Sequence, residues 1–333
     1  MRKINKRFVL ILTAVVILLG VGTYFLHGYQ LRRNARVFLD RAQEALKQGR
    51  RDVAAKNFQW YTELAPHDLD AQQQFAELLI DLRAYGPAYF RLETILRQDP
   101  ERTQARRMLV DVLLNIGRFR DAEEHLEQYL LKVNPDDAEL LTKLARCQRG
   151  LGQSREAVRT LEKAIHLQPD LAAAYAQLAG IYRYDPDLKD PQKADEWIAK
   201  MLATVKNEEA LRTAAIYYYQ SDRYDQALQY TRDILAKKND DVDFLILGAD
   251  CARRLEQLDL ARTWAEKAVA LDPQRADGYT LLAAIQAAQG HPDEGMATLQ
   301  NALKKVSDRA TVLASLAEMS LNQGDEKTAE NAI

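Results

Sequence analysis

Glycine and proline are scarce in this sequence, with 14 and 9 copies among 333 residues. Both residues interrupt helices, so their scarcity suits a helical chain. No stretch alternates between apolar and polar residues as a half-buried strand would. Cysteine is rarer still, at Cys147 and Cys251 only, and we expect each to be a buried filler about the size of alanine.

The residue patterns that carry catalysis are also missing. The five histidines are scattered, and no His-Glu-x-x-His, Cys-x-x-Cys, Gly-x-Ser-x-Gly or phosphate-loop pattern occurs. Residues 150–155 contain two thirds of a dinucleotide fingerprint, but no strand precedes them. We therefore expect no enzymatic activity, no cofactor and no metal site within these residues. We expect the acidic pairs Asp136–Asp137 and Asp240–Asp241, which lie between repeats, to cap the next helix.

Acidic residues are absent from the N-terminal end. Residues 1–34 hold six arginines and lysines and no acid, which leaves 40 basic and 48 acidic residues in 35–333. The larger part is therefore mildly acidic, with a net charge of −8. A general nucleic-acid-binding function is disfavoured by this charge, so no nucleic acid is expected as a partner.

One long uncharged run, Phe8 to Leu26, follows a basic tail over residues 1–7. As a helix it spans about 28 Å, close to the hydrocarbon thickness of a bilayer. We predict a transmembrane signal-anchor helix over 8–26 and a juxtamembrane linker over 27–34. A cleaved signal peptide is the alternative, but its apolar core should be shorter and no Ala-x-Ala site is present.

Positive charges flank this run on both sides, with four in residues 1–7 and four in residues 32–41. The charges before the run are denser and lie next to it. By the positive-inside rule they favour a cytoplasmic N-terminus and extracytoplasmic repeats at a cell membrane. Cytoplasmic repeats are the alternative.

What the sequence has in abundance is a repeated unit of about 34 residues, which starts near residue 35. In Ala138–Pro169, small residues at Ala145 and Ala157 allow two helices to approach, Gly152 ends the first helix and Pro169 stops the second. A small residue recurs at intervals of 33 to 37 residues at Ala54, Ala88, Ala122, Ala157, Ala194, Ala227, Ala261, Gly295 and Ala329. The two cysteines occupy one repeat position, three repeats apart, so a disulfide between them is implausible.

This pattern resembles the tetratricopeptide repeat (TPR) family. The resemblance implies an all-α, right-handed superhelical solenoid of helical hairpins over 35–333, preceded by one transmembrane helix. It predicts about nine repeats, of which the last is incomplete. Residues 103–137 carry one extra residue near Leu130–Val133, and the turn at Tyr184–Pro191 carries a three-residue insertion.

In this family, fixed positions of each first helix face a concave groove that binds an extended peptide. The charge balance at those positions is +2, so we predict a protein or peptide partner with acidic residues. The predicted groove residues are Arg107, Arg146, Arg149, Arg183, Tyr184, Arg212, Tyr219, Arg253 and Arg254. The alternative is that these arginines pair with the groove acids of neighbouring repeats, which are Asp111, Glu139, Glu209, Asp243 and Asp250. The family's carboxylate-clamp pattern is not matched.

Three functions are compatible with these features. The first is a membrane-anchored, non-catalytic scaffold that binds partner proteins through the groove. The second is the regulatory or substrate-binding arm of a larger protein, whose catalytic or export domain follows Ile333. We expect the natural polypeptide to continue past Ile333, because the ninth repeat stops within its second helix. The third is an anchored adaptor that faces the cytoplasm.

Overall fold

The structure, a computed structural model, describes residues 35–324 and 329–330. These residues form helices and turns without any strand, so the predicted all-α repeat array is confirmed for them. The chain divides into two compact units between Gln153 and Ser154. No helix of the described residues is long and apolar enough to cross a membrane, and the anchor predicted over residues 8–26 lies outside them.

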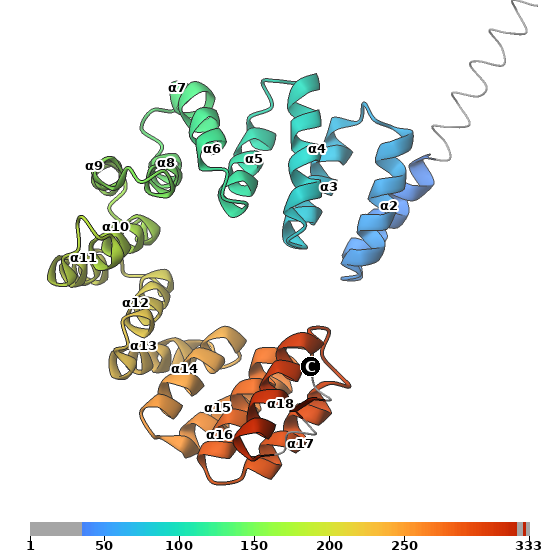
Figure 1. Ribbon diagram of the computed structural model, residues 1–333. Coiled ribbons are helices and arrows are strands. Elements are labelled where there is room, and N and C mark those ends of the chain that lie inside the picture. The colour runs from blue at the N-terminus through green and yellow to red at the C-terminus, as the bar shows by residue number, and fades with distance from the viewer. Residues whose placement is uncertain (1–34, 325–328, 331–333) are drawn as a thin grey trace, which may run out of the picture. The chain divides into compact units, whose positions relative to one another are not determined.

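The first unit is a stack of helical hairpins (Figure 1, blue to green). Residues 35–47 are helical and are followed by the labelled helices. Those are α2 (Arg51–Leu64), α3 (Leu69–Asp81), α4 (Tyr85–Gln98), α5 (Thr103–Asn115), α6 (Phe119–His125), η1 (Leu126–Leu130), α7 (Leu131–Val133) and α8 (Ala138–Gly150).

The second unit continues the same pattern (Figure 1, green to red). Its helices are α9 (Ser154–Leu167), α10 (Ala172–Tyr184), α11 (Pro191–Thr204), α12 (Glu208–Gln220), α13 (Tyr224–Lys237), α14 (Val242–Arg254), α15 (Leu258–Leu271), α16 (Ala276–Ala288), α17 (Pro292–Ala302) and α18 (Arg309–Asn322). The predicted insertion at Tyr184–Pro191 is the longer turn between α10 and α11.

Within each unit, a first helix packs on the second helix of its own hairpin, as α3 packs on α4 and α14 on α15, and a second helix packs on the next first helix, as α4 packs on α5 and α15 on α16. Successive first helices also contact one another, as α10 contacts α12 and α16 contacts α18. The recurring small residue explains this close packing. Ala88, Ala122, Ala194 and Ala261 are all 0% exposed, and at Gly295 even a Cβ atom would lie 2.8 Å from the carbonyl oxygen of Ala283.

The turns inside the hairpins follow the predicted glycine rule. Gly152 has φ +79° and Gly290 has φ +87°, in the left-handed region that glycine enters without a steric penalty. Where glycine is missing, Arg83, Asp222 and Glu256 take the same conformation with φ between 57° and 58°. The local geometry is therefore set by the repeat and not by the residue alone.

The extra residue of the third repeat is accommodated by a π-helical turn. The second helix of this hairpin starts as α6, becomes the π-helix η1 over Leu126–Leu130 and ends as α7. One inserted residue widens a helix locally in this way without changing where the helix ends. The small residue Ala122 before the insertion and Leu130 within it both remain buried.

Both cysteines lie in first helices, at 0% exposure, as predicted. Burial raises the pKa of Cys147 and of Cys251 to about 12. The thiols are therefore protonated at neutral pH and act as small apolar groups.

Candidate functional site

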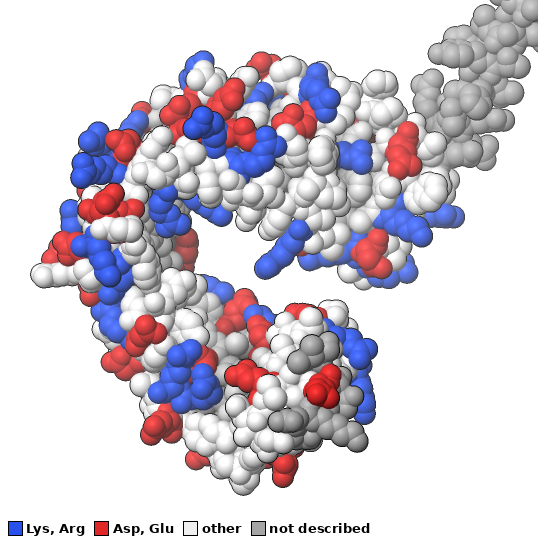
Figure 2. Space-filling model, in the orientation of Figure 1, with Lys and Arg blue, Asp and Glu red and all other residues white. Residues whose placement is uncertain are grey.

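In each unit, the candidate site is the surface formed by the first helices of its hairpins, which we call the first-helix face. It is made by α3, α5 and α8 in the first unit and by α10, α12, α14, α16 and α18 in the second. On the side of the molecule shown in Figure 2, basic and acidic side chains are interspersed over both units. Charge alone therefore distinguishes no part of this side of the molecule.

In the first unit, two of the three predicted groove arginines are held at a neighbouring first helix or by the residue that caps it. An Arg107 Nη atom lies 2.8 Å from Oδ2 of Asp137, the residue that caps α8. Arg146 donates a hydrogen bond of 3.4 Å to the carbonyl of Leu114 on α5. Arg149 is exposed and makes no side-chain ion pair within the part of the chain that is described.

In the second unit, Arg183 joins a cluster around one aspartate. Arg183, Arg223 and the Tyr217 hydroxyl converge on Oδ1 of Asp195, at 2.9, 2.6 and 2.5 Å. Burial alone would raise the pKa of Asp195, but the hydrogen bonds from Arg223 and Tyr217 lower it overall. Tyr184, which is 55% exposed, donates to the carbonyl of Gln220 at 2.8 Å.

A second aspartate, Asp250 on α14, gathers three of the predicted residues. Arg253 and Arg254 lie 2.6 and 2.8 Å from its carboxylate oxygens, and the Tyr219 hydroxyl donates to it at 2.7 Å. Burial would raise the pKa of this carboxyl, yet these three hydrogen bonds lower it overall. Burial, followed by the bond to Asp250, raises the pKa of Tyr219 to about 12.

Arg212 on α12 shows the same construction as Arg107. Its Nη1 atom lies 2.5 Å from Oδ2 of Asp241, which caps α14, and 3.3 Å from Glu208. Its guanidinium also stacks 4.3 Å from the centre of the Phe244 ring. The predicted capping roles of Asp137 and Asp241 are confirmed, because both side chains accept a backbone N–H at the start of the next first helix.

Five of the seven predicted arginines are therefore ion-paired. Their partners Asp137, Asp195 and Asp241 lie outside the predicted groove positions, and only Asp250 belongs to the acids named in the alternative. The missed signal is the spacing of about 30 residues from an arginine to the acid before the next first helix, as in Arg107–Asp137. Peptide binding by these arginines stays a prediction.

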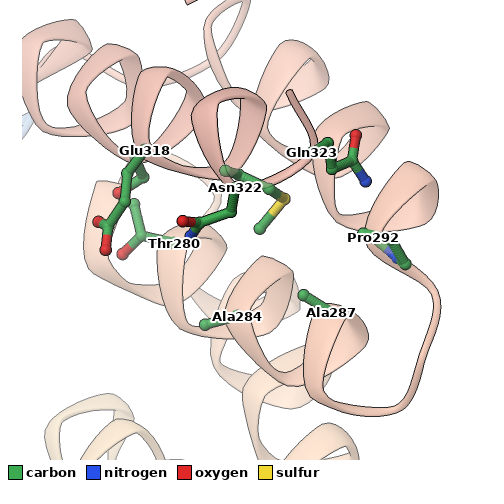
Figure 3. A pocket seen from close by; sticks show the side chains of 9 residues that line it. Thr280, Ala284, Ala287, Pro292, Glu318, Asn322 and Gln323 are labelled. Carbon is green, nitrogen blue, oxygen red and sulfur yellow. The ribbon is translucent and has the colours of Figure 1, made fainter. Parts of the chain in front are cut away.

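The described residues do hold a hollow on the first-helix face, between α16 and α18. This cavity has a volume of about 390 Å³. In Figure 3, Ala284 and Ala287 of α16 face Asn322 of α18 across it, and Thr280 lies beside Glu318 at one end. The hollow combines small apolar walls with a carboxylate, an amide and a hydroxyl group.

None of the predicted groove residues lines this hollow. It exists because alanine, at Ala284 and Ala287, occupies the first-helix positions that carry Arg146 and Arg149 in the fourth repeat. The sequence feature that indicates the hollow is therefore the change from a large to a small side chain at these positions, whereas our prediction relied on charged residues. Clusters of three or more potential metal ligands do not occur among the described residues.

Comparison with known proteins gives consistent results. Family models described as tetratricopeptide repeat match residues 83–133, 117–181 and 212–276. Hsp70-Hsp90 organizing protein 3 of Arabidopsis thaliana is 26% identical over 166 residues, which are 49% of this chain and 27% of that protein. The chain thus spans about a quarter of the length of this curated relative.

Solved structures resemble the chain at low sequence identity. The human IFIT1 dimer with PPP-AAAA matches with a TM-score of 0.51 and 17% identity, over 87% of this chain and 74% of that chain. A tetratricopeptide repeat protein from Parabacteroides merdae matches with a TM-score of 0.48 and 16% identity, over 76% of this chain and 99% of that chain. At these identities the likeness to IFIT1 shows a shared fold only.

Proposed function

Because this chain belongs to the tetratricopeptide repeat family, we propose that it is a membrane-anchored, non-catalytic scaffold whose first-helix face binds an extended segment of a partner protein. Residues 8–26 would be the anchor, with the N-terminus in the cytoplasm and the repeats outside it. The family supports protein interaction through the repeats in general. The anchor, the topology and the binding face are our proposal.

The observation that carries the proposal is the hollow between α16 and α18. Its volume of about 390 Å³ falls in the range of small-ligand sites, about 300–1,000 Å³. One or two side chains of an extended segment fit into such a space. Asn322 offers both a donor and an acceptor to a peptide backbone, and Glu318 offers a carboxylate to a cationic side chain.

The arginines on the other first helices have a different part in this proposal. Paired arginines such as Arg107 and Arg212 hold successive first helices in register, so that the face keeps its shape. Arg149, which is exposed and has no ion pair among the described residues, is the cation of the predicted set that remains open to an acidic partner residue. Exposed ion pairs are weak, so a carboxylate of the partner can also replace the carboxylate that pairs with an arginine at the edge of the face.

The binding face is tested by filling the hollow. A photo-crosslinking amino acid at Thr280 should capture a defined partner band in membranes, and Ala284→Leu should reduce that band strongly, because the larger side chain occupies the cavity. Ala270→Leu is the matched control, since Ala270 is exposed on α15, a second helix. Equal crosslinking in wild type and Ala284→Leu, with both variants folded by circular dichroism, would remove this face from the proposal.

The anchor is tested separately. The full chain should stay in the membrane fraction after extraction with alkaline carbonate, with its N-terminal sequence intact. Release into the supernatant, or a mature N-terminus near Thr23, would contradict an uncleaved anchor. A reporter that is active only outside the cytoplasm, fused after Ile333, should be active if the proposed topology is correct.

A further inference from the structure

The fourth residue of several first helices reaches back to the proline that closes the preceding repeat. In each case a side chain donates a hydrogen bond to the proline carbonyl. The pairs are Gln72 to Pro66 at 3.2 Å, Arg106 to Pro100 at 2.6 Å, Tyr175 to Pro169 at 3.0 Å and Tyr279 to Pro273 at 3.2 Å. Three of these side chains are neutral, and only Arg106 brings a charge into this position.

Arg106 is almost fully buried, at 6% exposure. Its Nη1 atom lies 3.0 Å from Nδ1 of His125, and its guanidinium stacks 3.7 Å from the centre of the Tyr129 ring. Ion pairs to Arg106 are absent from the described residues. A buried charge that lacks a counter-ion destabilises the folded chain. The neutral side chains of Gln72 and Tyr175, at the same position of other repeats, carry no such cost.

The histidine beside Arg106 does not supply a compensating charge. Arginine has only donors, so Nδ1 of His125 accepts, and its proton resides on Nε2. Burial, followed by repulsion from Arg106, lowers the pKa of His125, while Glu93, Glu124 and Asp121 act more weakly in the opposite direction. The imidazole is therefore neutral at pH 7, and the positive charge of Arg106 is left without an ion pair.

The π-helical turn opens a crevice next to this charge. Residues before and within α5 and residues of η1 and α7 line a cavity of about 210 Å³, which includes Pro100, Thr103, Arg106, Tyr129 and Lys132. Lys132 adds a second cation, and the exposed Glu101 is the carboxylate of the lining. The volume is below the range of about 300–1,000 Å³ usual for cofactor sites, so it suits the end of one side chain or of a polypeptide.

We propose that this crevice around Arg106 binds a carboxylate group presented by a partner polypeptide, from an acidic side chain or a C-terminus. The partner being a polypeptide rests on the proposed function; the preference for an anion rests on the buried guanidinium and Lys132. Guanidinium–carboxylate hydrogen bonds are among the strongest available, and three N–H groups of Arg106 remain beyond the two engaged by His125 and Pro100. The crevice belongs to the first unit and shares no residue with the hollow at Ala284.

The test uses the full chain in detergent, labelled with ¹³C at its histidines. The His125 resonance is assigned with His125→Gln, and N-acetylglycine serves as the carboxylate probe at pH 7 and constant ionic strength. We expect a saturable shift of the His125 resonance and a higher His125 pKa, because the bound anion offsets the repulsion by Arg106. Neutral N-acetylglycinamide should produce no saturable shift.

Two variants make the result specific. Arg106→Gln should weaken binding of N-acetylglycine about tenfold or more, and it should fold, because Gln72 makes the same proline bond one repeat earlier. Arg51→Gln removes an exposed arginine of α2 that belongs to neither proposed site, and it should leave binding unchanged. Absence of a saturable shift in the wild type, or equal binding by Arg106→Gln, would overturn the proposal.

Inorganic phosphate distinguishes the source of the anion. Weaker binding of phosphate than of N-acetylglycine is expected for a site shaped for a polypeptide carboxylate, and tighter binding of phosphate would overturn that assignment. Partner crosslinking at Thr280 can fail while N-acetylglycine still binds, or the reverse. Failure of this site and failure of the proposed scaffold function are therefore separable.

Discussion

At the scale of single residues, the hairpin turns show how a repeat imposes its geometry on unsuitable side chains. Glu256 has φ 58° at a position that glycine holds in other hairpins. A left-handed conformation costs an L-residue about 1–2 kcal/mol. The cost is absorbed by the packing of the helices on either side, because α14 and α15 form a hairpin like the others.

Glu256→Gly should therefore raise the free energy of unfolding by about 0.5–1 kcal/mol, since the steric cost disappears and part of the gain is lost to the more flexible unfolded chain. Gly290→Ala, at φ +87°, should lower the free energy of unfolding by about 1–2 kcal/mol. Thermal unfolding monitored by circular dichroism measures both. A lower melting temperature for Glu256→Gly would contradict the explanation.

Gly248 represents a different constraint, which is space. A Cβ atom there would lie 2.4 Å from the Trp264 ring and 2.7 Å from a methyl group of Thr231, although the backbone of Gly248 is ordinary helix. Gly248→Ala should thus destabilise the chain by about 1–3 kcal/mol through overpacking. Gly86→Ala is the control, because nothing lies within 4 Å of its Cβ position, and it should be neutral or slightly stabilising.

At the scale of elements, the π-helical turn determines which side chains meet Arg106. Residues before the turn keep the register of the other hairpins, and residues after it are displaced by one position. Tyr129 lies within η1 and covers the guanidinium at 3.7 Å. The contact therefore joins the buried arginine of α5 to a residue of the π-helical turn.

A double-mutant cycle with Arg106→Gln and Tyr129→Leu should give a coupling energy of about 0.5–2 kcal/mol, the range for a partly desolvated cation–π pair. Deleting Gln128 restores the usual repeat length and should turn the later residues of the helix by one position. The same cycle in that background should then give a coupling close to zero. A coupling that persists would mean that the stack does not depend on the π-helical turn.

Much of the element level could be predicted from the sequence, and the site could not. Small residues and Gly152 located the hairpins, because helix approach and left-handed caps admit few residue types. The extra residue near Leu130–Val133 was found by counting, but its conversion into a π-helix depends on which residues must stay buried. The ion-pair partners were missed because Asp137 and Asp241 were assigned to helix capping alone, whereas each does two tasks.

At the scale of the whole molecule, aspartates that bridge neighbouring repeats link stability to pH. Hydrogen bonds from arginines lower the pKa of Asp137, Asp195, Asp241 and Asp250 against the opposing effect of burial. A carboxyl whose pKa is lower in the folded chain than in the unfolded chain stabilises the fold above its unfolded pKa. That stabilisation is lost as the pH falls through the folded pKa.

The unfolded pKa of aspartate is about 3.9, so the melting temperature should be nearly constant from pH 7 to about pH 5 and should fall steeply below about pH 4. Asp250→Asn should melt at a lower temperature than wild type at pH 7, because Arg253 and Arg254 lose their counter-ion. The difference should shrink as the pH falls through the folded pKa of Asp250, which is held below its usual value, because the wild-type carboxyl then also becomes neutral. A difference that does not shrink while this carboxyl titrates would indicate that packing, and not charge, is responsible.

The ion pairs between successive first helices also bear on how such a chain can grow. Arg107 and Asp137 both belong to residues 103–137, and Arg212 and Asp241 both belong to residues 208–241. A tandem duplication of either segment would therefore copy the cation and its counter-ion together. The new junction would receive a capping aspartate together with the arginine that pairs with it. The array can therefore gain a hairpin in one genetic event without leaving either charge unpaired.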